Sequence, residues 1–445
     1  MKYLRTRDTA SGISMRTSNG MLTGVIRPLS GNNNERKTEE LMKKILRYLV
    51  IALIVAGLSS VVYAAVSKWI FVPNAASKTL SFIDPQKDMV IGHCDTGATG
   101  WLACLTPDLK KIYVGENGGD SVTVIDAVTH KTLKHIKTGK NPKHPLVTPD
   151  GKYVLVNHTG EVKAVLLDAR TDKELKTFAV DHGNKAQKGP LMMHSAFTWD
   201  SKYAFVQNYA DKKVYVLKIP SLEVVATIDG DSPAHYIVPT PDNKQAWIVL
   251  EGNDAAKIKP SVSIIDMATF NEVKKIEIPT AEGEPIEGHH GIFTLDGKNF
   301  FFCNRGPGPK FGGTTVAMID VAKQKIVRTL KGANSVGHPY LTPDGKYVVL
   351  TPYGGSNIIT FVDARTGLRL KDVAIGNGTH IGHMVFSADS KKAYATNAGD
   401  GAVYVIDMQT REVVKGIPTG DKAAQIINTY TNLFEVPGVY KLHSH

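Results

Sequence analysis

The sequence has few cysteines, and they form no recognisable binding pattern. The 445 residues include three, Cys94, Cys104 and Cys303. Their spacing matches neither a zinc site nor the C-x-x-C-H motif that attaches a c-type haem. Cys94 and Cys104 leave two interpretations open, a disulfide in an oxidising compartment or two unpaired buried thiols. Cysteine ligation of a metal and covalent haem attachment are therefore not expected.

Long basic runs are also missing from most of the chain. The formal net charge is +11, but residues 1–64 contain ten Lys or Arg against four Asp or Glu, a net of +6. The remaining 381 residues carry only +5. The excess positive charge thus belongs to the start of the chain, and we do not expect nucleic-acid binding.

After Lys68 no segment shows the 3.6-residue apolar period of a helix. No Ser-His-Asp or paired-carboxylate pattern stands out from the many Asp-containing turns. The chain instead has short alternating segments rich in Val, Ile, Tyr and Phe, separated by turn residues. This pattern predicts an all-β protein.

The amino-terminal part resembles an export signal. Residues 49–65 (LVIALIVAGLSSVVYAA) are apolar or small, and Lys43, Lys44 and Arg47 precede them. We predict a signal peptide or an uncleaved signal anchor over 42–64, after a disordered or mis-called extension over 1–41. Both alternatives export the rest of the chain to the periplasm or the cell surface. Contact with a membrane is expected only through this segment, if it is uncleaved.

One sequence unit recurs through the rest of the chain. Its clearest copies are HPLVTPDGKYV from His144 and HPYLTPDGKYV from His338. In five copies a histidine lies six residues before the Asp of a tight turn, and these copies begin at His144, His194, His290, His338 and His383. A sixth copy has His235 one place earlier, and a seventh has Leu102 and no histidine.

A second marker is an apolar strand that ends in Asp, as in residues 122–126 (VTVID) and 403–407 (VYVID). Successive markers are 42 to 54 residues apart, which is the length of a four-stranded propeller blade. Eight third-strand markers but seven clear first-strand markers predict eight blades. The amino-terminal end, from Leu80 to Asp95, would supply two outer strands, and the carboxyl-terminal end two inner ones.

This closure would remove exposed sheet edges. Seven blades with an extra terminal hairpin remain an alternative. The predicted organisation is a linker over 65–78 and a single β-propeller over 79–445.

These motifs carry a resemblance. Thr-Pro-Asp-Gly-Lys-Tyr-Val followed by Val-Ile-Asp-x-x-Thr resembles the YVTN-repeat propeller family, from Thr79 to the end of the chain. The repeat is also similar to the haem d1 propeller domain of respiratory nitrite reductase, and to the copper propellers nitrous oxide reductase and thiocyanate dehydrogenase. The haem d1 resemblance implies that His194 and His235 correspond to cavity histidines that bind the cofactor.

Propeller topology predicts where the histidines lie. The inner strand of each blade runs beside the central axis, so residues at its start ring one mouth of the channel. The expected ring is His144, His194, His235, His290, His338 and His383, with His289 and His380 close by. Neutral imidazole is a common ligand of transition metals. We therefore predict a metal site formed by these six histidines, with copper as the metal and haem d1 as the alternative cofactor.

Explanations that need no ligand also account for the repeated histidines. Duplication copies any residue of an ancestral blade, and histidines at this position also seal a channel mouth and hydrogen-bond the next blade. Glu287 is either a carboxylate beside His289 and His290, as a base or metal ligand, or part of a solvated loop.

Three functions follow from these alternatives. The first is an exported, oxidoreductase-type metal protein, which would need an external electron-transfer partner such as a c-type cytochrome. The second is a haem d1-binding or haem d1-assembly protein. The third is a non-catalytic propeller that binds a protein or a polymer. Whether the protein is an enzyme stays open.

Overall fold

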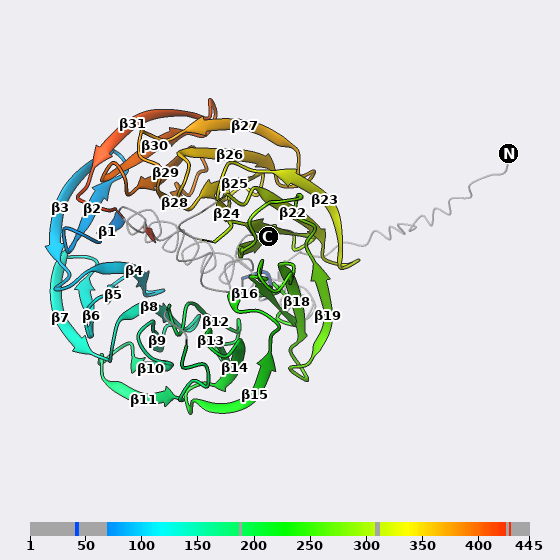
Figure 1. Ribbon diagram of the computed structural model, residues 1–445. Coiled ribbons are helices and arrows are strands. Elements are labelled where there is room, and N and C mark those ends of the chain that lie inside the picture. The colour runs from blue at the N-terminus through cyan, green and yellow to red at the C-terminus, as the bar shows by residue number, and fades with distance from the viewer. Residues whose placement is uncertain (1–40, 44–68, 187–188, 308–311, 424–426, 429–445) are drawn as a thin grey trace, which may run out of the picture. The chain divides into compact units, whose positions relative to one another are not determined.

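The computed structural model describes residues 41–43, 69–186, 189–307, 312–423 and 427–428. From Ile70 onward these residues form eight four-stranded antiparallel sheets, arranged around a central channel (Figure 1). The eight-bladed prediction is confirmed. Among the described residues, no helix is both long enough and apolar enough to span a membrane. The predicted extension and signal segment, residues 1–64, lie outside the described residues except for 41–43.

Each blade has an inner strand beside the channel and three further strands toward the rim (Figure 1). The inner strands are β32 (Ile427–Asn428), β4 (Gly100–Leu105), β8 (Pro142–Val147), β12 (Ser195–Phe197), β16 (Ala234–Pro239), β20 (Gly288–Phe293), β24 (Val336–Leu341) and β28 (Ile381–Phe386). The second strands are β1 (Ile70–Asn74), β5 (Lys111–Glu116), β9 (Tyr153–His158), β13 (Tyr203–Asn208), β17 (Gln245–Leu250), β21 (Asn299–Asn304), β25 (Tyr347–Pro352) and β29 (Lys392–Asn397).

The third strands carry the Asp-ending marker in seven of the eight blades. They are β2 (Thr79–Asp84), β6 (Ser121–Asp126), β10 (Lys163–Asp168), β14 (Lys213–Lys218), β18 (Ser261–Asp266), β22 (Thr315–Asp320), β26 (Ile358–Asp363) and β30 (Ala402–Asp407). The outer strands are β3 (Met89–Asp95), β7 (Lys131–Lys137), β11 (Glu174–Ala179), β15 (Glu223–Asp229), β19 (Glu272–Glu277), β23 (Lys325–Lys331), β27 (Arg369–Ala374) and β31 (Glu412–Pro418).

The ring closes differently from the expected two-plus-two division. The closing sheet has the order β3-β2-β1-β32, so the amino-terminal end supplies three strands and the carboxyl-terminal end one. Ile70 pairs with Asn428 and Phe71 with Ile427. Strand β1 lies in the segment 65–78 that we predicted to be a linker. Its sequence, IFVPN, contains a proline and no turn marker, and it becomes a strand because β2 and β32 supply hydrogen-bonding edges on both sides.

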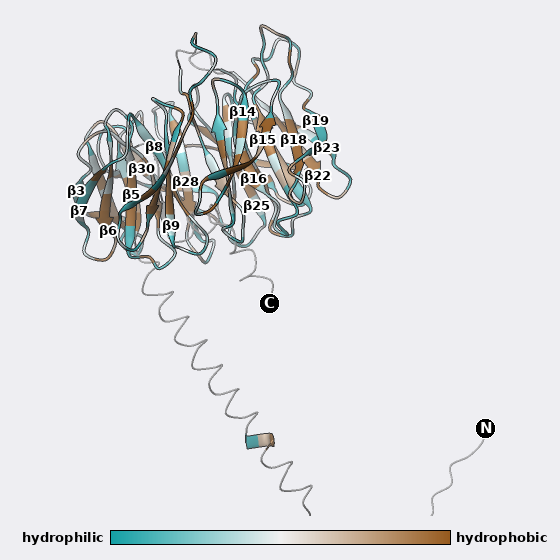
Figure 2. Cartoon of the chain, turned by 90° about the horizontal axis from the view of Figure 1, so that it is seen from below, coloured by the Kyte–Doolittle hydropathy of each residue, from teal (hydrophilic) through white to brown (hydrophobic). Residues whose placement is uncertain are grey.

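The core lies between neighbouring blades. Trp247 on β17 is fully buried and packs against Phe293 and Phe300 of the next blade, with ring centroids 5.2 and 5.0 Å away. The second and third strands are largely apolar (Figure 2). Outer strand β3 alternates exposed and half-buried residues, and β7 is exposed at five of its seven positions. A single sheet could not bury both faces, so each blade depends on its neighbours.

The Thr-Pro-Asp-Gly turn joins inner and second strands at the face opposite the histidines. Thr148 Oγ1 donates to Asp150 Oδ1 at 2.7 Å and accepts from the Tyr153 amide at 3.0 Å. The residue after the Asp has φ of +72° at Gly151, in the left-handed region that favours glycine. The three cysteines are free thiols, so the disulfide alternative is not realised.

Candidate ligand site at the channel mouth

A β-bulge at the start of the inner strand positions the candidate side chains. In the β16–β17 pair, Ala234 is opposite Leu250 and Tyr236 is opposite Val249, which leaves His235 as an extra residue. Similar register shifts occur at the start of five other inner strands, β4, β8, β20, β24 and β28. A bulge re-aims a side chain. It therefore explains how His235, one place out of step in the sequence, also reaches the mouth.

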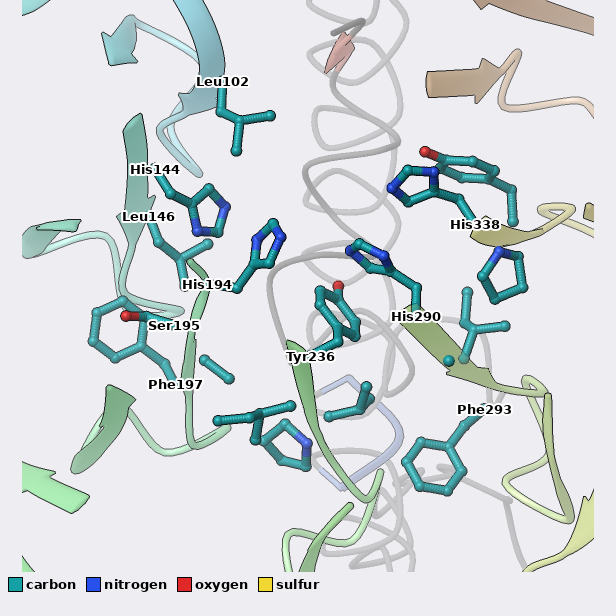
Figure 3. Close-up of a pocket in the computed structure, with 18 of the residues that line it drawn as sticks. Leu102, His144, Leu146, His194, Ser195, Phe197, Tyr236, His290, Phe293 and His338 are labelled. Atoms are coloured by element: carbon teal, nitrogen blue, oxygen red, sulfur yellow. The ribbon is translucent and has the colours of Figure 1, made fainter. Parts of the chain in front are cut away.

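Five imidazoles line one pocket in the channel, those of His144, His194, His290, His338 and His383. Figure 3 shows four of them, from opposite sides of the channel, around a common space. Their ring centroids form a chain, with 4.9 Å from His144 to His194, 5.1 Å from His194 to His290, 4.2 Å from His290 to His338 and 4.8 Å from His338 to His383. Below them the wall is apolar and includes Leu146, Phe197, Ile292 and Phe293.

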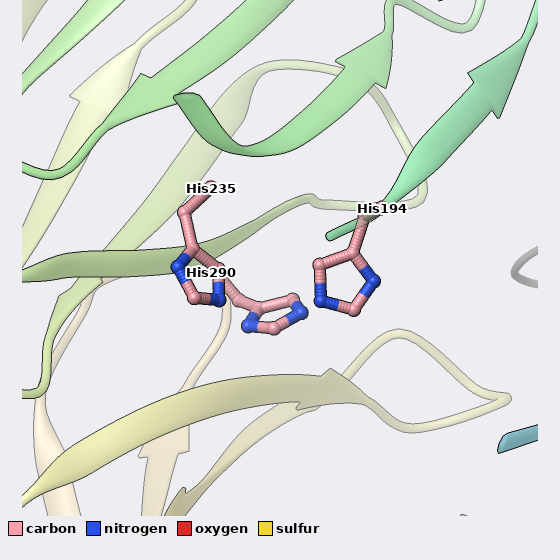
Figure 4. A group of neighbouring side chains, drawn as sticks. All are labelled: His194, His235 and His290. Carbon is pink, nitrogen blue, oxygen red and sulfur yellow. The ribbon is translucent and has the colours of Figure 1, made fainter. Parts of the chain in front are cut away.

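All six predicted site histidines thus gather at the mouth, but His235 is not part of the pocket wall. Figure 4 shows His235 next to His290, with His194 facing both. His289, which sequence reasoning placed only nearby, joins the cluster, since its ring centroid is 3.9 Å from that of His235. That these side chains bind a metal stays a prediction.

The imidazoles differ in their hydrogen bonds. The Nδ1 atoms of His144, His194 and His338 are buried and have no hydrogen-bond partner. His383 Nδ1 lies 2.8 Å from the Tyr340 hydroxyl of the preceding blade. The plain structural explanation, hydrogen bonding between blades, therefore suits His383 but not the first three. A buried polar atom without a partner is costly, and a bound ligand would remove that cost.

Burial keeps the imidazoles neutral. It lowers the pKa of His144 to about 4, with a contribution from the Lys143 ammonium. Burial likewise lowers the pKa of His383 to about 3, and the pKa values of His194, His290 and His338 well below the usual 6.5. At neutral pH these rings therefore keep a lone pair for a metal ion.

Charged groups lie around the histidines. Glu251 Oε1 is 2.6 Å from His235 Nδ1, and the Tyr209 hydroxyl donates to Glu251 Oε2 at 2.5 Å. Burial raises the pKa of Glu251 to about 7. Glu287 forms an ion pair with Arg305, whose guanidinium lies 5.2 Å from the centroid of the Tyr353 ring.

Sequence reasoning missed Lys143. It occupies the bulge position of β8, equivalent to that of His235 in β16. Its ammonium group makes no hydrogen bond or ion pair within the described part of the chain. Burial, followed by the Arg305 charge, lowers its pKa to about 8, so it is mainly cationic at pH 7. Its position directly before His144 was the feature of the sequence that could have identified it, since a bulge brings two successive residues toward the channel axis.

Fold and site together define a β-propeller with a histidine-lined central channel. The sequence model described as the cytochrome D1 heme domain matches residues 122–349, just over half of the chain. The chain belongs to this family and is a haem d1-related propeller. No curated protein matches the sequence.

Solved structures show the same architecture. The chain is similar to NirN, a dihydro-heme d1 dehydrogenase solved in complex with DHE, with a TM-score of 0.68, 18% identity, and coverage of 82% of this chain and 76% of NirN. The Kuenenia stuttgartiensis hydrazine synthase gives a TM-score of 0.55 at 22% identity, over 69% of this chain and 95% of that one.

A protein of unknown function from Desulfotomaculum acetoxidans gives a TM-score of 0.53 at 11% identity, over 81% of this chain and 98% of that one. At these identities the likenesses show the fold alone. Copper has no support from any of the comparisons.

Proposed function

We propose that the channel mouth binds a tetrapyrrole of the haem d1 type and that the protein takes part in binding or assembling that cofactor. The observation that carries the proposal is the set of three buried, unpartnered Nδ1 atoms, on His144, His194 and His338, above an apolar pocket. Membership of the cytochrome d1 haem domain family supports the choice of ligand class.

The residues present fit such a ligand on three counts. Neutral imidazole is an axial ligand of haem iron. The wall below the imidazoles is apolar and aromatic, which suits the flat ring of a tetrapyrrole. Lys143 supplies a cation that forms no ion pair with a carboxylate of the described residues, and acidic side chains of a tetrapyrrole would neutralise it.

Among the two predicted cofactor ligands, the geometry favours His194. Its ring lines the pocket and its Nδ1 has no partner. His235 lies outside the pocket wall and its Nδ1 is engaged by Glu251. In this proposal His194 would hold the iron, the apolar wall would exclude water, and Lys143 would orient the acidic edge of the ligand. A bound haem d1 would supply iron redox chemistry.

NirN is named as a dihydro-heme d1 dehydrogenase. We infer from this likeness that the ligand is a haem d1 or one of its precursors, and we propose binding or assembly rather than a particular reaction. We also propose that the protein acts in the periplasm, consistent with the apolar segment 49–65. Any electron transfer would need an external partner, such as a c-type cytochrome.

A second candidate function is direct binding of copper by the predicted six-histidine ring. The observation that favours it is that ligand atoms of His194, His235 and His290 lie within 4.8 Å of one another. The mouth also has more imidazoles than one haem would need.

The test is reconstitution of the full chain with haem d1 and with copper. A stoichiometric complex with a shifted visible absorption band, lost in His194→Ala and kept in His135→Ala, supports the tetrapyrrole proposal. His135 is a matched control because it lies on outer strand β7, away from the mouth. Binding of copper without any tetrapyrrole would favour the second candidate. Binding of neither ligand by folded protein would overturn both and leave a protein- or polymer-binding propeller.

A further inference from the structure

The histidines at the mouth fall into two groups by their contacts. Five line the pocket, whereas His235 and His289 do not. Both come from the bulged segments of adjacent inner strands. His235 is the extra residue between Ala234 and Tyr236 of β16, and His289 lies between Gly288 and Gly291 of β20, where a register shift occurs. These two imidazoles are therefore not accounted for by a ligand in the pocket.

A carboxylate completes a compact set. Glu287 directly precedes β20, and ligand atoms of His235, Glu287 and His289 all lie within 4.8 Å of one another. The three residues are 2%, 9% and 3% exposed, respectively. Ligand atoms at about 2.0–2.2 Å from one metal ion are at most roughly 4.4 Å apart. Small side-chain rotations would therefore bring all three onto a single ion.

Both imidazoles are held through Nδ1, which leaves Nε2 available. His235 Nδ1 is 2.6 Å from Glu251 Oε1, and Glu251 is held in turn by the Tyr209 hydroxyl at 2.5 Å. His289 Nδ1 is 3.1 Å from the Gly337 carbonyl oxygen and 2.8 Å from His290 Nδ1. Within the described part of the chain, neither Nε2 atom has a hydrogen-bond partner. Metal-binding histidines in proteins are oriented in this way, with the other ring nitrogen on a carboxylate or a carbonyl.

Glu287 is oriented as well. Arg305 pairs with its Oε1 atom, which fixes the carboxylate and leaves Oε2 without a hydrogen bond to the described residues. A carboxylate paired with an arginine is common without a metal. The separate orientation of both imidazoles beside it is not explained by that ion pair.

We propose that His235, His289 and Glu287 form a mononuclear site for a divalent transition-metal ion of the zinc and ferrous-iron class, distinct from the pocket assigned above to the tetrapyrrole. Two imidazoles and one carboxylate are the donor set of catalytic zinc sites and of non-haem iron(II) sites. The proposal does not depend on tetrapyrrole binding. Three protein ligands would leave coordination positions open for water or a small ligand.

Cobalt(II) titration of the chelator-treated full chain tests the site, because Co²⁺ gives visible bands when it replaces zinc, and Zn²⁺ competition then gives the affinity. The wild-type chain should bind one ion. His289→Gln and Glu287→Gln should each weaken binding by at least about 100-fold, since a loss of that order already follows removal of outer partners. Glu251→Gln, which changes only the partner of His235, should weaken binding by roughly 10- to 100-fold.

Matched controls separate this site from the pocket. His135→Gln and Glu223→Gln change the same residue types on outer strands β7 and β15, and both variants should bind cobalt normally. His194→Ala should lose the tetrapyrrole and keep cobalt, whereas His289→Gln should do the reverse.

If the wild-type chain binds no ion, or if His289→Gln and Glu287→Gln bind as tightly as wild type, the proposal fails. Loss of cobalt in His194→Ala but not in His289→Gln would place the ion in the pocket and also overturn it. Should Glu287→Gln misfold because Arg305 loses its partner, His289→Gln alone decides, with its urea unfolding curve as the folding check.

Discussion

The two ends of each inner strand belong to one repeated unit, but their polar side chains are hydrogen-bonded to different degrees. At the turn end, all seven Thr or Ser side chains of the motif donate to the Asp two residues later, at 2.6–2.8 Å. At the mouth, His144, His194 and His338 have buried Nδ1 atoms without partners. The contrast shows that the repetition of a residue in every blade does not by itself indicate whether that residue stabilises the fold or binds a ligand. The turn end serves stability, and the unsatisfied mouth is where a ligand is expected.

In the ligand-free protein, acid should lower the free energy of unfolding more than any of the single substitutions below, because it protonates the buried histidines at the mouth. Burial lowers the pKa of His144 to about 4, against 6.5 in the unfolded chain. The unfolded state therefore binds the proton first, so stability is fully present above pH 6.5 and falls as the pH approaches 4. This difference corresponds to roughly 3 kcal/mol for His144 alone. Urea unfolding of the wild-type chain and of His144→Leu, compared between about pH 7 and pH 4.5, isolates it, because the other titrating groups are common to both chains.

The turn end supplies the comparison for this experiment. Burial opposes ionisation of Asp150, but hydrogen bonds from Thr148 and Lys152 outweigh it and lower its pKa below 3.8. Its contribution is therefore lost only below the pH range of the experiment. The contribution of Glu251 to stability changes with pH in the opposite direction to that of His144. Because burial raises the pKa of Glu251 to about 7 in the folded state, its contribution is lost as the pH rises through that value. If the free energy of unfolding does not fall between pH 6.5 and 4.5, the conclusion that the histidines at the mouth are buried and neutral is wrong.

Thr148→Val at the turn end should destabilise the protein by about 1–2 kcal/mol without changing ligand binding. The substitution keeps the shape of the side chain but removes hydrogen bonds to Asp150 and Tyr153 in a fully buried position. Urea unfolding at pH 7 measures the loss. Thr342→Val, in the equivalent turn of a distant blade, should cost the same, and the two losses should add. Altered tetrapyrrole binding in either variant would argue against the division of roles.

His144→Leu at the mouth should change stability least, between zero and a gain of about 1 kcal/mol. Leucine fills a similar volume and removes a buried Nδ1 atom that has no partner. The comparison is unfolding in urea at pH 7, beside Thr148→Val. A loss above about 1.5 kcal/mol would mean that His144 has a structural role in the ligand-free protein.

Sequence reasoning predicted the repeat, the eight blades and the six histidines at one mouth, because strand period and turn residues are local properties. It assigned two strands of the closing blade to the carboxyl-terminal end and missed the strand at Ile70–Asn74, since a short segment such as IFVPN becomes a strand only when partner edges are present. It also left Lys143 out and could not group His289 with His235. Bulges are set by pairing between strands, and the sequence of one strand does not show them.

Motifs whose spacing repeats with each blade are therefore enough to predict the architecture and the imidazole content of the channel. The packing of the blades sets which nitrogen atoms lack a hydrogen-bond partner, which imidazoles line the pocket, and which carboxylate lies beside them. His235, Glu287 and His289 come from two blades, and their grouping depends on how the sheets pack around the channel. Burial in that packing also sets the charge of each ring, because the cost of ionisation depends on the surroundings and not on the residue type.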